Sequence, residues 1–200
     1  MAAIDFYLSP GSPWTYLAIG RLIQMTRTAG VGINVMSIDT ARTMPATGGV
    51  PLSERSPERL TYRLQELRRW RDDLGAELNI QPAYHPFDTR PASLAIIAAP
   101  AGGVSSIDMA QVVLNGVWRD QRDLADPTVI RELIATAGGD ADAVMAEAAK
   151  PETAARYEAF GDLAIAAGVF GVPTFVYKGE ILWGQDRLFF LERLLVDSER

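Results

Sequence analysis

Gly11-Ser12-Pro13-Trp14 places a hydroxyl side chain where a short apolar run gives way to a helical pattern. Serine before proline is typical of a helix start, with Ser12 as the N-cap residue and Pro13 at the first helical position. An N-cap oxygen accepts a hydrogen bond from a backbone N–H of the first turn, so its own proton stays free to donate. The free amides and the positive dipole end of a helix favour an anion at the same place. Ser12 is therefore either a plain helix cap or a residue that binds an anion.

A bound thiolate is one anion that could use this position. A free thiol has a pKa of about 8.5, so holding it ionised at neutral pH takes roughly 2 kcal/mol. A helix dipole typically contributes about 0.3–1 kcal/mol, and a hydrogen bond to a charged group about 1.5–3 kcal/mol. The dipole alone is marginal, whereas the dipole together with the Ser12 hydroxyl is sufficient. The sequence contains no cysteine, so such a thiol would belong to a bound molecule.

A second motif, Gly168-Val169-Phe170-Gly171-Val172-Pro173-Thr174-Phe175, runs into an apolar segment. Because proline cannot donate a hydrogen bond within a sheet ladder, Pro173 should lie at the start of a strand. A cis Val172–Pro173 bond would turn the backbone of Val172 toward the Ser12 helix. Only about 5–6% of X-Pro bonds in folded proteins are cis, so these residues alone leave an ordinary trans turn open.

Composition excludes several other functions. Without cysteine there is no disulfide, protein thiol nucleophile, zinc–thiolate site or dithiol redox cycle. The only histidine, His85, and nearby Asp88 do not make a recognisable ligand set, so we expect no metal site. The formal net charge of -6 argues against nucleic acid as a partner. No apolar run approaches the ~20 residues of a membrane helix, and the N-terminus does not resemble a secretory signal. We therefore expect a cytoplasmic protein with no membrane partner.

Hydrophobic periodicity predicts the elements that hold these motifs. Residues 3–9 and 32–38 are predicted strands on either side of a helix at 13–28. Residues 41–54 show no clear period and are predicted to be a loop. Helical patterns then follow from Ser56 through Leu74 and at 91–99, 107–119, 127–137 and 140–148. The chain ends with a helix at 151–167, a hairpin of strands at 174–178 and 180–183, and a helix from Asp186.

This order predicts an α/β fold with a thioredoxin-like domain, residues 1–40 and 151–200, and an all-helical insertion, residues 41–150. The insertion should add no strand to the central sheet, because it lacks any run of period 2. The helix that begins at Ser56 is expected to turn its charged face to solvent rather than to a ligand. This face comprises Arg63, Glu66, Arg68, Arg69 and Arg71.

Together the motifs resemble those of the 2-hydroxychromene-2-carboxylate isomerases and the related kappa-class glutathione transferases, within the DsbA-like thioredoxin group. The resemblance runs almost from end to end, and although each piece is weak by itself, their order is specific. The pieces are Asp5-Phe6-Tyr7, Ser12-Pro13-Trp14-Thr15-Tyr16-Leu17-Ala18, Tyr62 through Leu67 with Arg69 and Trp70, Trp118, Asp123-Leu124-Ala125-Asp126-Pro127, Gly168 through Phe175, and Trp183-Gly184-Gln185-Asp186-Arg187-Leu188.

The resemblance implies an isomerase that uses glutathione. In that family the serine matching Ser12 contacts the glutathione sulfur. The residue before a cis-proline, here Val172 before Pro173, pairs its backbone with the cysteinyl unit, and the segment matching Gln185 and Asp186 binds the γ-glutamyl end. The implied reaction is reversible addition of the thiol to a conjugated aromatic-degradation intermediate, with rotation before the thiol is expelled. A homodimer is also implied. A kappa-like glutathione transferase and a glutathione- or ligand-binding protein without turnover stay open as alternatives.

One loop departs from the family pattern. Pro45-Ala46-Thr47-Gly48-Gly49 stands where the family often has Lys-Ala-Thr-Gly-Asn, so two anchors for carboxylates are missing. Phe87-Asp88-Thr89 likewise replaces a Phe-Asn-Thr-like segment. Arginine could replace the lost cation, although such long side chains are more often at the surface. The candidates are Arg42, Arg63 and Arg90.

We expect a substrate pocket of aromatic residues beside Ser12, with less cationic anchoring than isomerases of this group usually have. Its predicted residues are Phe6, Trp14 and Tyr84, of which Phe6 and Tyr84 could instead be packing residues. A dry aromatic pocket would favour a flat conjugated ring. The substrate itself is not fixed by the sequence.

Overall fold

A mixed four-stranded sheet lies at the centre of the computed structural model, which describes residues 3–197. β1 (Ile4–Leu8) pairs in parallel with β2 (Ile33–Ser37) and antiparallel with β3 (Thr174–Tyr177), which pairs antiparallel with β4 (Glu180–Trp183). The strand order is β2-β1-β3-β4. A parallel pair needs a crossover connection, and α1 (Pro13–Ala29) supplies it. The predicted strand–helix–strand opening and C-terminal hairpin are confirmed.

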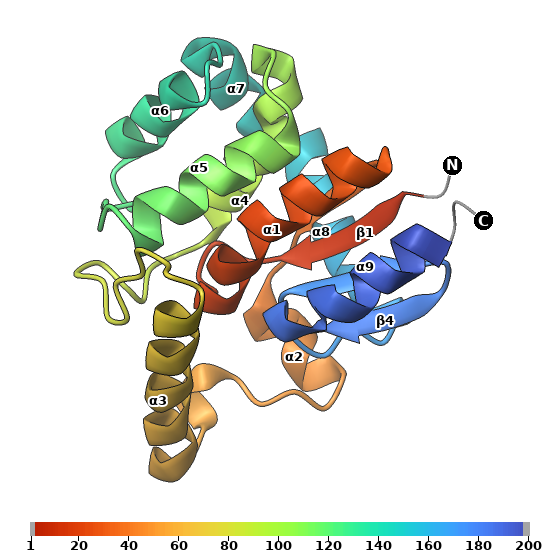
Figure 1. Cartoon of the computed structure of the whole chain (residues 1–200). Coiled ribbons are helices and arrows are strands. Elements are labelled where there is room, and N and C mark those ends of the chain that lie inside the picture. Colours follow the sequence, from red (N-terminus) through yellow and green to blue (C-terminus); the bar gives the residue numbers. More distant parts are fainter. Residues whose placement is uncertain (1–2, 198–200) are drawn as a thin grey trace.

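The two faces of β1 pack against different helices, because successive side chains of a strand point to opposite sides. Ile4, Phe6 and Leu8 are fully buried in the main core, which includes residues of α1 and α9 (Leu188–Asp197). Tyr7 lies on the other face in a smaller cluster with Ala164 of α8 (Pro151–Ala166). In Figure 1, α1 and α9 lie in front of the sheet and α8 behind it.

Residues 41–150 form helices and loops, and none of them pairs with the described sheet, as predicted. Most of these helices begin at a side chain that caps the first turn, such as Ser56, Ser105 and Asp126. The elements are α2 (Thr40–Ala46), η1 (Leu52–Glu54), α3 (Pro57–Asp73), α4 (Arg90–Ala98), η2 (Ala99–Gly102), α5 (Ser106–Trp118), α6 (Pro127–Thr136) and α7 (Ala141–Ala148). A last short turn, η3 (Gln185–Arg187), precedes α9.

The prediction of a loop at 41–54 is wrong, since this stretch contains α2 and η1. Asp39 starts α2 by accepting hydrogen bonds from two backbone amides of the first turn. Pro45 inside the helix and the glycines after it mask the helical pattern in the sequence. Because α2 begins at Thr40, the predicted domain boundary between 40 and 41 falls in its first turn.

The helical region shares one core with the sheet domain. α5 packs on α1, and α4 contacts both β2 and α8. Trp118 of α5 is fully buried, and its indole Nε1 donates a hydrogen bond to the Pro10 carbonyl, 3.0 Å away. This contact ties the helical region to the residues directly before Ser12.

α3 behaves differently from the other long helices. Of its residues only Leu67 is buried, and in Figure 1 the helix extends away from the sheet. One side of α3 faces the segment from Trp183 to Arg187 across a cavity. No helix of residues 3–197 combines the length and apolar character needed to cross a membrane.

Candidate active site at the start of α1

The Ser12 hydroxyl lies between the start of α1 and the segment that leads into β3. Its Oγ accepts a hydrogen bond from Thr15 N at 3.2 Å, as expected of an N-cap residue. The same hydroxyl donates a long bond to the Val172 carbonyl at 3.4 Å. The Val172–Pro173 bond is cis, and this confirms the predicted isomer and its position opposite the helix start. Ser12 is 7% exposed, so water has little access to the hydroxyl.

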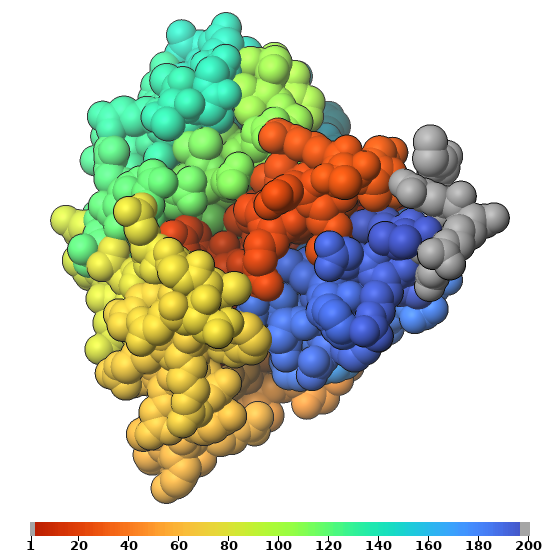
Figure 2. Space-filling model, in the orientation of Figure 1, coloured from red at the N-terminus to blue at the C-terminus, as the bar shows by residue number. Residues whose placement is uncertain are grey.

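A cavity of about 580 Å³ adjoins this pair and is rich in aromatic side chains. It lies between the start of α1, one face of α3 and the segment from Trp183 to Arg187. Its aromatic residues are Trp14, Tyr62, Trp70 and Trp183. In Figure 2 the yellow surface of α3 adjoins the blue C-terminal surface beside the red start of α1. The volume and the aromatic lining suit a small flat ligand.

Three further predicted site residues line this cavity: Val172, Gln185 and Asp186. Arg21 of α1 holds the turn that contains Gln185 and Asp186 in place. It donates to the Gln185 carbonyl at 3.1 Å and also to the Gln185 side-chain oxygen. Burial lowers the pKa of Arg21, whereas the charge of Asp186 raises it. Ser12 does not itself line the cavity and reaches its wall through Val172.

The predicted pocket needs a correction at two of its three residues. Trp14 lines the cavity, but Phe6 and Tyr84 do not. Phe6 is fully buried in the core, where its ring stacks on Phe175 with centroids 5.2 Å apart. Tyr84 is 51% exposed in the loop before α4. Phe6 is excluded because its position in β1 turns it toward the core, and Tyr84 because its loop lies apart from the cavity.

The cavity carries more positive charge than the altered loop suggested. Arg55, Arg59 and Arg63 line it. Arg59 and Arg63 lie one turn apart on α3, and Arg55 lies in the extended stretch directly before its N-cap. The expected solvated face is therefore wrong for Arg63 and Glu66, which both line the cavity. The sequence carries no local signal that separates Arg63 from the solvated arginines of the same helix.

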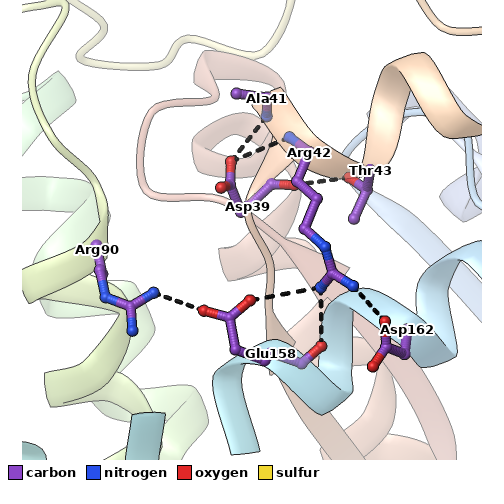
Figure 3. Close-up of polar contacts among 7 residues, drawn as sticks. All are labelled: Asp39, Ala41, Arg42, Thr43, Arg90, Glu158 and Asp162. Carbon is purple, nitrogen blue, oxygen red and sulfur yellow. Dashed lines mark hydrogen bonds and ion pairs between the residues drawn. The ribbon is translucent and has the colours of Figure 1, made fainter. Parts of the chain in front are cut away.

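Arg42 and Arg90, the other candidates for the missing loop lysine, are engaged elsewhere (Figure 3). Arg42 of α2 forms ion pairs with Glu158 and Asp162 of α8. Arg90 at the start of α4 pairs with the second carboxylate oxygen of Glu158 at 2.7 Å. Partly exposed pairs of this kind contribute little one by one, but Glu158 links three elements. Neither arginine lines the cavity.

Thr15 is a residue that the sequence analysis did not single out. It is the third residue of α1, is fully buried, and its Oγ1 has no hydrogen-bond partner among residues 3–197. A buried hydroxyl without a partner usually costs about 1–3 kcal/mol. The start of α1 thus carries a second hydroxyl beside Ser12 whose hydrogen-bonding capacity is unused.

His85 packs behind the Ser12 loop. Its Nε2 is 3.3 Å from the Gly11 carbonyl, and its ring lies 4.9 Å from that of Trp118. Burial lowers the pKa of His85, the Gly11 hydrogen bond raises it, and nearby Arg63 lowers it. The His85–Pro86 bond is also cis. Within residues 3–197 no three potential metal-ligating side chains from His, Cys, Asp or Glu come together.

The altered loop packs against the motif that carries Val172. Thr47 Oγ1 donates to the Val169 carbonyl at 2.9 Å. Gly49 lies so close to the next residue of the motif that a Cβ built on it would be 2.7 Å from the Phe170 carbonyl and 3.1 Å from that of Met44. Glycine here allows a close backbone approach that a side chain would obstruct.

Replacing Gly49 with alanine should destabilise the protein by about 1–3 kcal/mol, since both obstructing oxygens belong to the backbone and must move. Gly20→Ala is the matched control, because the nearest atom to a Cβ there is 3.7 Å away and α1 should gain about 0.5–1 kcal/mol. Urea denaturation of both variants measures the difference. Equal stability of Gly49→Ala and the wild type would contradict the close approach.

Comparisons with known proteins identify the family of the chain. Residues 3–196 match the family model described as DSBA-like thioredoxin domain. The 2-hydroxychromene-2-carboxylate isomerase of Pseudomonas sp. (strain C18) is 33% identical over 195 residues, covering 94% of this chain and 88% of the relative. The isomerase of the same name from Sphingobium xenophagum is 28% identical, covering 97% and 98%.

Solved structures show the same fold. A 2-hydroxychromene-2-carboxylate isomerase structure superposes with a TM-score of 0.82 at 30% identity, covering 99% of this chain and 96% of the other. The cytosolic disulfide reductase DsbM from Pseudomonas aeruginosa, also solved with GSH, shares the fold at 20% identity, 96% and 98% coverage and a TM-score of 0.70. The chain therefore has a DsbA-like thioredoxin fold with a helical insertion, and it belongs to the DSBA-like thioredoxin family and, within it, to the 2-hydroxychromene-2-carboxylate isomerase family.

Proposed function

We propose that this protein is a glutathione-dependent isomerase acting on a small conjugated aromatic acid of the 2-hydroxychromene-2-carboxylate type. The observation that carries the proposal is the Ser12 hydroxyl, which meets the Val172 carbonyl at 3.4 Å beside an aromatic cavity. The relatives that share most of the chain bear this isomerase name. By the same resemblance we propose that it acts in the cytoplasm as a homodimer.

The residues present fit glutathione. The long Ser12–Val172 hydrogen bond is weak enough for the hydroxyl to turn to a stronger acceptor, and a thiolate is one. The backbone of Val172 lies at the cavity wall, where it can pair with an extended peptide-like ligand. The Asp186 carboxylate lies at the other side, and an ammonium group suits it. These three groups support binding through the sulfur, the cysteinyl backbone and the γ-glutamyl end.

When bound, glutathione supplies a thiol that adds reversibly to a conjugated carbon, so that a double bond becomes single, rotates and re-forms as the thiol leaves. Ser12 and the start of α1 favour the ionised sulfur through a hydrogen bond and the helix dipole. Trp14, Trp70 and Trp183 offer flat apolar faces against which the ring can pack. Arg21 keeps the Gln185 turn in register with α1.

Turnover of a hydroxychromene carboxylate should require glutathione and should return it unchanged. Isomerisation is followed by absorbance with and without glutathione, and free thiol is counted at the end. Loss of free thiol to a stable adduct would instead identify a transferase, and binding without turnover a ligand-binding protein. Rapid turnover without glutathione would refute the proposal that the glutathione thiol is the nucleophile.

A further inference from the structure

The α3 arginine row, Arg55, Arg59 and Arg63, puts positive charge on one wall of the cavity. Arg55 lies in the extended stretch before the N-cap of α3, and Arg59 and Arg63 lie one turn apart on the helix. Such spacing brings like charges together, which destabilises a helix unless opposite charge is near. The wall therefore either has acidic partners within the protein or is complementary to an anion.

The acids of the same cavity have other partners. Glu58 accepts hydrogen bonds from its own backbone N–H and from Ser56, and these lower its pKa. Glu66 forms an ion pair with Arg69, one turn further along α3. Asp186 pairs with Arg187 at 3.2 Å. The cavity's carboxylates are thus engaged away from the row.

The row itself lacks counter-ions among residues 3–197. Arg55 Nε donates to the Val50 carbonyl at 3.0 Å, a neutral partner. Arg59 donates its backbone N–H to Ser56, but within residues 3–197 the guanidinium groups of Arg59 and Arg63 have no hydrogen bond or ion pair. Burial lowers the pKa of Arg63 and so does the charge of Arg55, while burial and the charge of Arg59 lower that of Arg55. Arginine nevertheless stays charged, so the repulsion persists until an anion binds.

We propose that the α3 arginine row binds a ligand carboxylate, opposite the Gln185–Asp186 turn, and takes the place of the lysine missing from the 45–49 loop. The inference rests on the proposed function. Two ligand carboxylates could supply this chemistry: the glycyl carboxylate of glutathione and the carboxylate of the aromatic acid. A guanidinium presents a planar fork of donors that matches a carboxylate in two hydrogen bonds. The neighbouring Tyr62 and Trp70 lie on the same helix and offer faces for a ring.

Four probes in two pairs separate the two sources, and each pair differs only in a carboxylate. Glutathione is compared with its glycyl ethyl ester, and 2-naphthoate with 2-naphthamide, by titration calorimetry. The variants are Arg63→Gln and Arg59→Gln. Arg68→Gln is the matched control, since Arg68 lies on the same helix, is exposed and does not line the cavity.

Wild type should bind at least one acid more tightly than its uncharged partner. Arg63→Gln and Arg59→Gln should weaken the binding of that acid by about 10- to 100-fold and leave the binding of its uncharged partner unchanged. Arg68→Gln should alter the binding of neither. If the row variants lose affinity for glutathione, the row binds the glycyl carboxylate. If they lose affinity for 2-naphthoate, the row binds the carboxylate of the aromatic acid.

The proposal is overturned if wild type binds neither acid better than its uncharged partner, or if both row variants bind all four probes as wild type does. Removing a charge from the row relieves repulsion, so thermal unfolding should confirm that both variants stay folded. Because the readout is binding, a failed isomerase assay would refute the proposed activity without touching this result.

Discussion

Ser12→Ala is expected to raise the pKa of a bound glutathione thiol by about one to two pH units, because it removes a charge-assisted hydrogen bond of about 1.5–3 kcal/mol. Thr15 N also loses its capping partner, which costs about 0.5–2 kcal/mol of stability and should leave the domain folded. The pKa is read from the ultraviolet absorbance of the thiolate as the pH is varied.

The sign of the activity change follows from the same shift. A thiol whose pKa is lowered in the complex is ionised at and above neutral pH, so the wild-type rate should level off near neutrality. With a wild-type thiol pKa of about 7, a rise of about one to two pH units in Ser12→Ala lowers the ionised fraction at pH ~7 about 5- to 50-fold, and the rate should recover as the pH rises. A rate that fell equally at every pH would show a loss of positioning rather than of ionisation.

Thr15→Val provides the matched control for Ser12→Ala. The two side chains have similar shape, and Thr15 Oγ1 has no partner within residues 3–197, so its removal should be neutral or stabilising for the fold. In this variant the backbone N–H of residue 15 still donates its hydrogen bond to the Ser12 hydroxyl. An unchanged thiol pKa in Thr15→Val and in Ser12→Ala would leave Ser12 as a plain helix cap. A rise in both variants would assign the sulfur to two hydroxyls.

The parts of the site that could be predicted are those with short-range signals. Ser12 before Pro13 determines a capped helix start through local backbone chemistry alone. The order of strands and helices then requires a crossover between β1 and β2 and places Val172 opposite that start. Both motifs were found because each depends on a few neighbouring residues.

The cavity wall could not be predicted, because its two sides come from distant parts of the chain. Arg63 on a charged helix is indistinguishable from a solvated residue until Trp183 and Asp186 are placed across from it. Phe6 fits a core or a pocket equally well by residue type. Only the pairing of β1 with β3, which sets Phe6 against Phe175, decides for the core. These outcomes depend on tertiary packing rather than local pattern.

Trp118→Ala should cost about 3–5 kcal/mol of unfolding free energy, enough to unfold a large fraction of a marginally stable domain. The residue is fully buried and joins α5 to the Pro10 carbonyl and to the His85 ring. Its loss leaves a large cavity where the helical region meets the Ser12 loop. Urea denaturation measures the change, and Trp183→Phe, at a side chain 48% exposed, should shift the midpoint little.

Trp118→Phe separates packing from the hydrogen bond, since it keeps most of the ring and removes the indole N–H. The Pro10 carbonyl then loses its donor, which costs about 1–3 kcal/mol if the group stays buried. If that bond also positions the chain before Ser12, the bound thiol pKa should rise in Trp118→Phe although no residue of the cavity has changed. An intact pKa with reduced stability would limit Trp118 to holding the two regions together. A variant as stable as wild type would show that the hydrogen bond contributes nothing, and that packing alone joins the helical region to the start of α1.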